Sequence, residues 1–150
     1  LNRVAHYYHS GEETGQVKAM SVYAKEIKKF IKWCTDTFEM RYTNFFVDPA
    51  CKSLREELHQ VGIITERADN NAIDAKRQGG GIEVGIERTQ NAITNEQLFL
   101  VDNNEYDHYH FLKEIGMYTR DDKGNPIDEF NHAMDEFRYS INYFYKRYVL

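Results

Sequence analysis

Short apolar segments alternate with stretches of helical periodicity along this chain, and this alternation most constrains its fold. Runs such as "NFFV" and "QLFLV", each bounded by polar or turn residues, are typical of buried strands. Between these runs, apolar residues recur three and four positions apart, as they do in amphipathic helices. Strands that alternate with helices favour an α/β layered fold with parallel strand pairs.

The same pattern places each element along the chain. We expect strands at residues 2–9, 44–47, 63–68 and 97–101, and helices at residues 19–39, 51–62, 82–93, 105–118 and 130–148. Gly62 should end the second of these helices, because glycine readily adopts a left-handed backbone conformation. Polar loops are expected at residues 10–16, 69–81 and 119–129.

The composition limits the class of protein. At 150 residues, with 41% hydrophobic and 14% aromatic side chains, the chain can bury the core of one globular domain. It has no signal-peptide pattern, and no apolar run reaches the roughly 20 residues that a membrane helix needs. Cys34 and Cys51 form neither a disulfide framework nor a zinc-binding spacing, which indicates a reducing, intracellular setting. A net charge of −5 argues against broad affinity for nucleic acid but leaves a nuclease open, because metal-binding carboxylates are themselves negative.

Two aspartates stand where a site of such a fold could form. Asp48 directly follows the strand of residues 44–47, so its side chain should emerge at the carboxyl end of the sheet, where ligands bind in α/β folds. A purely structural Asp-Pro turn is the other interpretation. Asp135 lies on the last helix, where the spacing of His132, Asp135 and Arg138 places three polar side chains on one face. An ordinary surface ion pair of Asp135 with Arg138 explains that pattern equally well.

Together the two aspartates suggest a metal site. Mg²⁺ and Mn²⁺ prefer carboxylate oxygens, and carboxylates from separate segments can converge at a strand edge. Two such ions about 4 Å apart activate a water and stabilise the leaving oxygen of a phosphodiester. His132, one turn from Asp135, could orient the water or contact the scissile phosphate.

Several motifs resemble one family. The segments "FFVDPA", "DNNAIDAKRQGGGIEVGIERTQNAI" and "NPIDEFNHAMDEFRY", with the terminal aromatic helix, look like the nuclease domain of the large terminase subunit of tailed bacteriophages. The early "VAHYYHSGEE" resembles the strand and turn before the first long helix of that family. The likeness is spread over most of the chain, and N-H-A-M-D-x-x-R-Y is its most specific part.

The resemblance implies a ribonuclease H-like α/β fold, in which a mixed sheet is flanked by helices. It implies an endonuclease that cuts concatemeric double-stranded DNA during genome packaging, with two divalent ions, Mg²⁺ or Mn²⁺, held by three acidic residues. By position, Asp48 matches the middle acid, Asp135 the last acid, and His132 the neighbouring histidine of the motif. Arg138 and Tyr139 match an R-Y pair that we assign to packing and support of the helix.

The resemblance also implies partners and a place of action. These are the terminase ATPase domain, the small subunit and the portal, in the cytoplasm of the infected bacterial host. No G-x-x-x-x-G-K-[ST] motif occurs in the chain, so the ATPase motor is not expected within it. Lys76 and Arg77, before the run of glycines, are candidate contacts to DNA phosphates, although a solvated loop explains them equally well.

The chain departs from the family at its start. The first acid of the family lies on an opening strand, and no strand-borne Asp precedes residues 2–9 here. Glu12 and Glu13 lie in a loop and are poor substitutes. We therefore expect residues 1–150 to be a nuclease domain that begins after the first catalytic carboxylate. Such a fragment should bind metal weakly, cut poorly and pair its exposed strand edges with a second copy, as a homodimer.

The remaining candidates are weaker. His6 with His9, and His108 with His110, are expected to be packing or surface histidines, and Asp128 a turn or capping group. Two other functions stay open. One is another ribonuclease H-like phosphodiesterase, such as a junction resolvase or transposase core, and the other is a non-catalytic docking or assembly module.

Overall fold

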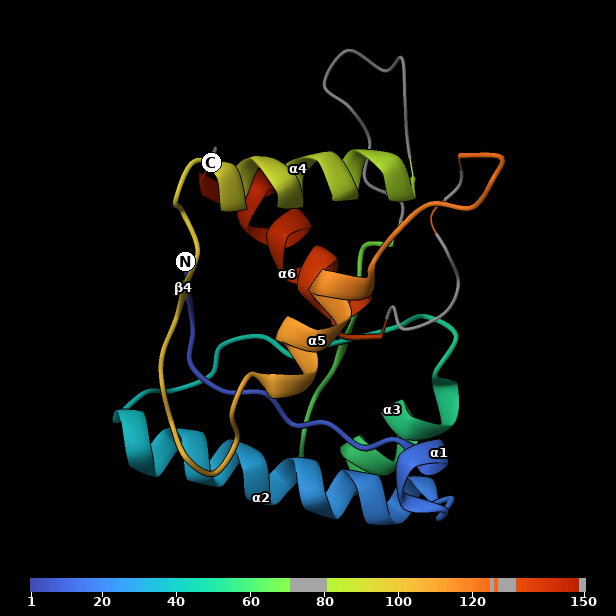
Figure 1. Cartoon of the computed structure of the whole chain (residues 1–150). Coiled ribbons are helices and arrows are strands. Elements are labelled where there is room, and N and C mark those ends of the chain that lie inside the picture. The colour runs from blue at the N-terminus through green and yellow to red at the C-terminus, as the bar shows by residue number, and fades with distance from the viewer. Residues whose placement is uncertain (71–80, 125, 127–131, 149–150) are drawn as a thin grey trace. The chain divides into compact units, whose positions relative to one another are not determined.

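The computed structural model describes residues 1–70, 81–124, 126 and 132–148, and the chain forms two compact units. Unit 1 comprises Leu1–His6 and Asp69–Leu150, and unit 2 comprises Tyr7–Ala68. Helices predominate in both units (Figure 1). In chain order, the described elements are β1 (Asn2–Arg3), α1 (Gly11–Thr14), α2 (Met20–Phe38), β2 (Phe46–Val47), α3 (Lys52–Gln60), β3 (Glu66–Arg67), α4 (Ile82–Thr94), β4 (Phe99–Leu100), α5 (Tyr109–Met117) and α6 (His132–Tyr148).

Unit 2 is built on the long helix α2, which packs against α3. One face of α2 is apolar because Ala24, Ile27 and Ile31 follow one another at intervals of three and four residues. Ala24 is fully buried, and this face packs on a core that contains Leu58 of α3. Shortly after α3, Gly62 adopts a left-handed φ of 86°, as expected from its place in the sequence.

The strands β2 and β3 of unit 2 form a parallel pair, in which Phe46 lies opposite Glu66 and Val47 opposite Arg67. Parallel strands need a crossover connection, and α3 supplies it. The chain turns directly after β2. Asp48 is therefore placed at the carboxyl end of this small sheet.

Unit 1 is built around α6, which packs against both α4 and α5 (Figure 1). The core between the three helices includes Ala92 of α4 and Phe111 of α5. The rings of Phe111 and Phe137 meet edge-on, with their centroids 5.2 Å apart. The buried apolar residues of α6 share one face, and they are Ala133, Met134, Phe137 and Ile141.

The second strand pair, β1 with β4, also belongs to unit 1 and is also parallel. Beyond β1, the backbone bonds to a loop instead of a strand. The side-chain amide of Asn103 donates to the Val4 carbonyl at 3.0 Å, and the His6 N–H donates to the Tyr106 carbonyl at 3.0 Å. β1 is short because its neighbour changes from a strand to a turn.

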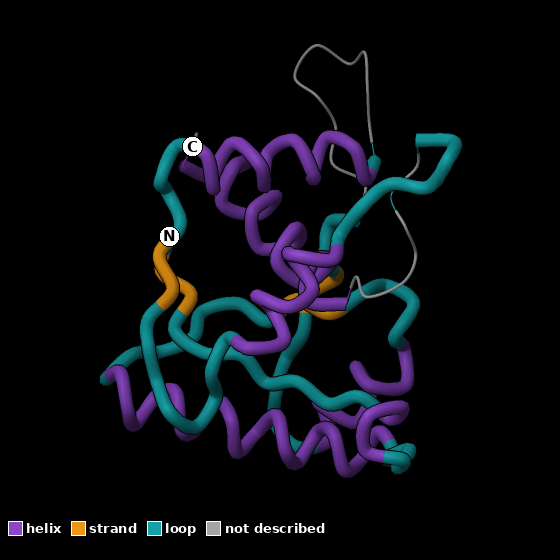
Figure 2. Tube along the Cα trace, in the orientation of Figure 1, coloured by secondary structure: helices purple, strands orange, loops and turns teal. Residues whose placement is uncertain are grey.

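The predicted helices and the parallel pairing are confirmed. All five expected helices are present as α2 to α6, and both described strand pairs are parallel. The expected strand at residues 2–9 is wrong beyond Arg3, and irregular chain joins most elements (Figure 2). The expected loop at residues 10–16 contains the short helix α1, because the Ser10 hydroxyl accepts a hydrogen bond from the Glu13 N–H at 3.2 Å and caps it.

The described strands form two separate two-stranded sheets. The fold is thus mixed α/β, with helices and short parallel strands, while the single ribonuclease H-like sheet and the assignment of residues 1–150 to one nuclease domain stay predictions. No helix in the part of the chain that the structure describes is long and apolar enough to cross a membrane.

Candidate functional site

Helix α6 carries the three polar residues that the sequence places on one face. His132 is exposed, Asp135 has 34% of its side chain exposed, and Arg138 has only 4% exposed. Arg138 Nη2 donates to Asp135 Oδ1 at 2.8 Å, and its guanidinium carbon lies 5.0 Å from the centre of the Tyr139 ring. Asp135 Oδ2 has no hydrogen-bond partner among the described residues. The column therefore runs from solvent into the unit, and Asp135 lies at the boundary with one oxygen engaged.

The same face of α6 holds the backbone of residues 69–70. Arg138 Nη1 donates to the Asn70 carbonyl at 3.2 Å, and the fully buried Asn142 donates to the Asp69 carbonyl at 3.2 Å. Lys146 pairs with the Asp69 carboxylate at 2.6 Å. Arg138 is thus fixed at both ends of its guanidinium group, by a carboxylate and by a backbone carbonyl.

Tyr118 lies within the electrostatic influence of two ion pairs, Asp135–Arg138 and Glu83–Arg120. Arg120 donates to both carboxylate oxygens of Glu83, in the first turn of α4, at 2.8 and 2.9 Å. The hydrogen bond from Arg120 holds the pKa of Glu83 below its usual value. Burial raises the pKa of Tyr118, Asp135 raises it further, and Arg138 lowers it. Tyr118 therefore responds to both charges of the Asp135–Arg138 pair.

Glu114 of α5 fixes the start of α6. This side chain is 4% exposed, and its Oε2 accepts a hydrogen bond from the Ala133 N–H at 2.7 Å. The first N–H groups of a helix have no partner within it, and a carboxylate there also interacts favourably with the helix dipole. Glu114 thereby sets the first turn of α6, from which His132 and Asp135 project.

Asp48 lies in unit 2, in the turn after β2. Its Oδ1 accepts a hydrogen bond from the Ala50 N–H at 2.7 Å, and its carbonyl accepts one from the Cys51 N–H at 3.0 Å. This geometry is an Asx turn. Burial raises the pKa of the Cys51 thiol, and the charge of Asp48 raises it further. Asp48 thus stabilises a turn and also occupies the carboxyl end of a parallel strand.

The candidate metal ligands are the carboxylate oxygens of two aspartates. Asp48 and Asp135 belong to different units, and each is described within its own unit. In the described part of the chain, no three His, Cys, Asp or Glu residues are grouped so that they could hold a metal ion. Carboxylate oxygens nevertheless suit Mg²⁺ and Mn²⁺. The assignment of Asp48 and Asp135 as ligands, with His132 beside them, stays a prediction.

Apart from the histidines, the remaining predicted residues lie either outside the described part of the chain or in helix α1. Lys76, Arg77 and Asp128 lie outside the described residues. Glu12 and Glu13 are exposed and belong to the short helix α1 instead of a loop.

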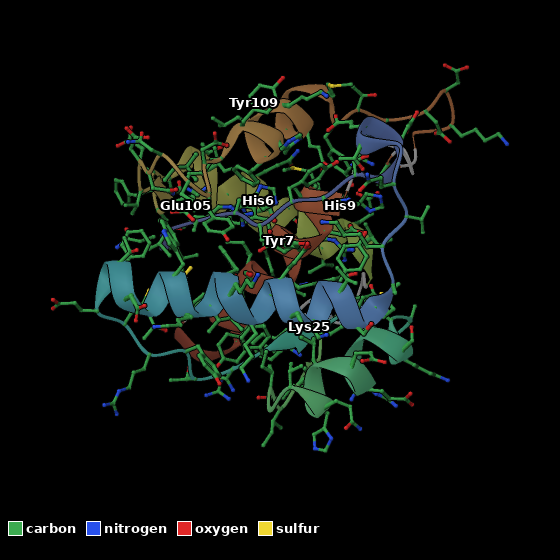
Figure 3. The ribbon with its side chains drawn as sticks, turned by 90° about the horizontal axis from the view of Figure 1, so that it is seen from below. His6, Tyr7, His9, Lys25, Glu105 and Tyr109 are labelled. Carbon is green, nitrogen blue, oxygen red and sulfur yellow. The ribbon has the colours of Figure 1, made fainter. Side chains whose placement is uncertain are left out.

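Two of the histidines predicted to be packing or surface residues, His9 and His108, contact protein groups. His6 and His9 fall in different units. His9 lies beside α2, where its Nδ1 is 2.8 Å from the Tyr23 hydroxyl (Figure 3). His108 is buried, and its Nε2 is 3.1 Å from the Val101 carbonyl.

Two residues that shape the site are absent from the sequence-based candidates. Gly85 lies within α4 against Arg138, and an isolated glycine inside a helical pattern often has such a packing reason. Glu114 follows the buried Phe111 by three positions, which places its carboxylate on the apolar face of α5. Both signals are present in the sequence, but neither identifies the partner.

The fold and the site define a mixed α/β protein with a half-buried carboxylate on its last described helix. Among solved structures, the chain is similar to the large terminase from a thermophilic bacteriophage in complex with ADP. The TM-score is 0.70 at 22% sequence identity, and the match covers 91% of this chain and 31% of the terminase chain. This chain therefore spans less than a third of that protein. No family model and no curated protein matches it.

At this identity the likeness concerns the fold. The chain has a terminase-like mixed α/β fold, in agreement with the family resemblance of its motifs.

Proposed function

We propose that this chain contributes the nuclease of a phage DNA-packaging terminase large subunit, as a metal-dependent endonuclease that cuts concatemeric double-stranded DNA. The likeness in fold to a phage large terminase, over 91% of the chain, carries this proposal. The position of Asp135 supports it, because this half-buried carboxylate keeps Oδ2 without a partner among the described residues.

The chemistry assigns a role to each residue. Asp48 and Asp135 would hold Mg²⁺ or Mn²⁺ through carboxylate oxygens. When bound, two such ions activate a water for attack on phosphorus and stabilise the leaving oxygen. Arg138 engages Asp135 Oδ1 and leaves Oδ2 for a ligand. His132, exposed in the first turn of α6, would orient the water or contact the scissile phosphate.

The proposed partners follow from the same function. They are double-stranded DNA, the terminase ATPase domain, the small subunit and the portal, in the cytoplasm of the infected host. Both sheets in the described segments have two strands, so every strand in them has an open edge. Open edges favour pairing with a second copy, which supports a homodimer of this chain.

The test is a plasmid cleavage assay with Mn²⁺. The chain is assayed beside a form extended upstream by about one strand pair, roughly 20 to 30 residues, which is where the resemblance expects the first acid. Asp135→Asn removes the negative charge of the Asp135 side chain. Asp36→Asn is the matched control because Asp36 lies in an exposed ion pair on α2. We expect cleavage by the extended form, loss of cleavage with Asp135→Asn, and no loss with Asp36→Asn.

Each alternative has its own outcome. Normal cutting by Asp135→Asn would remove Asp135 from the chemistry. If neither form cuts, the docking module becomes the better explanation, in accord with the absence of a three-residue ligand group among the described residues. A strong preference for branched DNA or for defined ends would favour a resolvase or transposase core.

A further inference from the structure

Arg138 is an unusual residue for the position it occupies on α6. Its side chain is 4% exposed, although a surface ion pair with Asp135 would leave both groups in water. It meets three groups at once: the Asp135 carboxylate at 2.8 Å, the Asn70 carbonyl at 3.2 Å and the ring of Tyr139. The planar guanidinium can bridge two acceptors in fixed directions, which a lysine ammonium cannot do.

Space for this side chain comes from a glycine on the neighbouring helix. Gly85 of α4 is buried, and a Cβ built there would lie 2.6 Å from Arg138 Cγ and 2.7 Å from Cδ. Ordinary contacts between carbon atoms are about 3.5–4.0 Å. The atoms concerned are in the middle of the arginine side chain, so they cannot swing away while the guanidinium keeps its contacts. Any side chain at Gly85 must therefore displace Arg138.

We propose that Arg138 is a positioning residue for Asp135, and that Gly85 is the residue that lets α4 and α6 approach closely enough to lock it. The inference rests on the proposed function, in which Asp135 is a metal ligand. Arg138 occupies Oδ1 from a fixed direction, so the carboxylate can present only Oδ2 outward. Arg138 touches neither substrate nor metal in this role.

Misplacing Asp135 should lower the rate of cleavage, because the orientation of the reacting groups matters most once they are bound. A misplacement of about 1 Å can lower a rate about 100-fold. Gly85→Ala keeps every charge of the site and meets Arg138 most closely, with the Asn142 amide next at 3.2 Å, so it tests position apart from electrostatics. Gly116→Ala is the matched control, since Gly116 is also helical, on α5, and a Cβ there meets nothing within 4 Å.

Cleavage at saturating Mn²⁺ and the affinity for Mn²⁺ by titration calorimetry are both measured, in the form of the protein that cuts, at a temperature where circular dichroism shows each variant folded. Gly85→Ala should weaken Mn²⁺ binding as well as cleavage, which a purely structural role of Arg138 would not do while the variant is folded. We expect Gly85→Ala to lose about 10- to 100-fold in rate. Gly116→Ala should cut at the wild-type rate. In an Arg138→Ala background, Gly85→Ala should add little further loss, because the two closest contacts of the new Cβ are with the Arg138 side chain.

Two results would overturn this inference alone. One is wild-type cutting by Gly85→Ala when Asp135→Asn is inactive. The other is an equal loss from Gly85→Ala with and without Arg138, which would mean that the glycine acts by another route. If Gly85→Ala does not fold, Arg138→Lys decides, since a lysine keeps the charge but cannot bridge Asp135 and Asn70; a wild-type rate for it would also refute the role.

The proposed function fails in a different way. If Asp135→Asn cuts at the wild-type rate, Asp135 has no part in the chemistry, and the positioning role of Arg138 falls with it. If Asp135→Asn is inactive and Gly85→Ala cuts normally, the nuclease stands and only the positioning role is lost.

Discussion

Lowering the pH from 7 to 5 should destabilise this chain through one histidine. His6 lies in unit 1, and its ring is labelled in Figure 3. Burial is the largest of the causes that together lower its pKa from 6.5 to about 3. The nearby charge of Arg3 lowers the pKa as well, as do His108 and His110, whereas Asp107 raises it. The folded chain thus keeps this imidazole neutral under conditions in which an unfolded chain would protonate it.

The direction of this change in stability follows from the number of protons that the folded and unfolded states bind. Between the two pKa values, the unfolded state binds a proton that the folded state does not, so the free energy of unfolding falls as the pH falls from about 6.5 towards 3. The slope approaches about 1.4 kcal/mol per pH unit, and the loss between pH 7 and pH 5 is about 2 kcal/mol. For a chain of this size that corresponds to about 4–8 °C in the midpoint of thermal unfolding.

Urea titrations at several pH values between 5 and 7 would measure this loss. Carboxylates remain largely ionised in that range, so it isolates the histidines. His6→Gln should reduce the loss by about 2 kcal/mol. His59→Gln is the control, because His59 lies exposed on α3 and keeps its hydration on folding. An unchanged pH slope in His6→Gln, or an NMR titration of the His6 ring centred above pH 6, would refute the reasoning.

Two further predictions concern packing and surface charge in unit 1. Phe111→Ala should destabilise the chain by about 3–5 kcal/mol in urea unfolding, because the ring is 1% exposed and packs on Phe137. The control is Tyr109→Ala, on the same helix but 61% exposed, which should change the stability little. Equal effects of the two substitutions would contradict the assigned core. Arg120→Ala removes the exposed ion pair with Glu83 and should leave the midpoint of thermal unfolding nearly unchanged. A clearly lower midpoint of this variant at low salt would contradict the prediction.

The helices could be predicted because their apolar residues repeat with the helical period. The faces of α2 and α6 that contain Ala24 and Ile141 are buried as that period requires. Strand length could not be predicted in the same way. The apolar segment at residues 2–9 has the composition of a strand, but the partner of Val4 and His6 is the loop that contains Asn103, and nothing near the segment in sequence indicates this. Sheet pairing depends on residues about 100 positions away.

The sequence predicted which residues of α6 could form the candidate site, but not how they are buried or what contacts them. The spacing of His132, Asp135 and Arg138 placed them on one face of a helix, and the structure agrees. Burial was not predictable, because the groups that cover Arg138 include Gly85 of α4 and the backbone of Asn70, both distant in the sequence. Glu114 shows the same limit, since its carboxylate caps a helix 19 residues away in the sequence. A sequence pattern assigns a residue to a face, whereas the packing of a neighbouring helix decides whether that face meets water.

The depth of burial along α6 separates the two interpretations of its polar column. A solvated stripe would expose all three residues, but exposure falls from His132 through Asp135 to Arg138. Stability alone does not explain a buried arginine, because replacing a buried ion pair by apolar residues of similar volume is often neutral or stabilising. An apolar side chain at this position would fill the space beside Gly85 as well. What it would not do is hold Asp135 by one oxygen and Asn70 by its carbonyl at the same time. The arginine therefore accounts for the geometry of the carboxylate, which is what a site that acts through Asp135 requires.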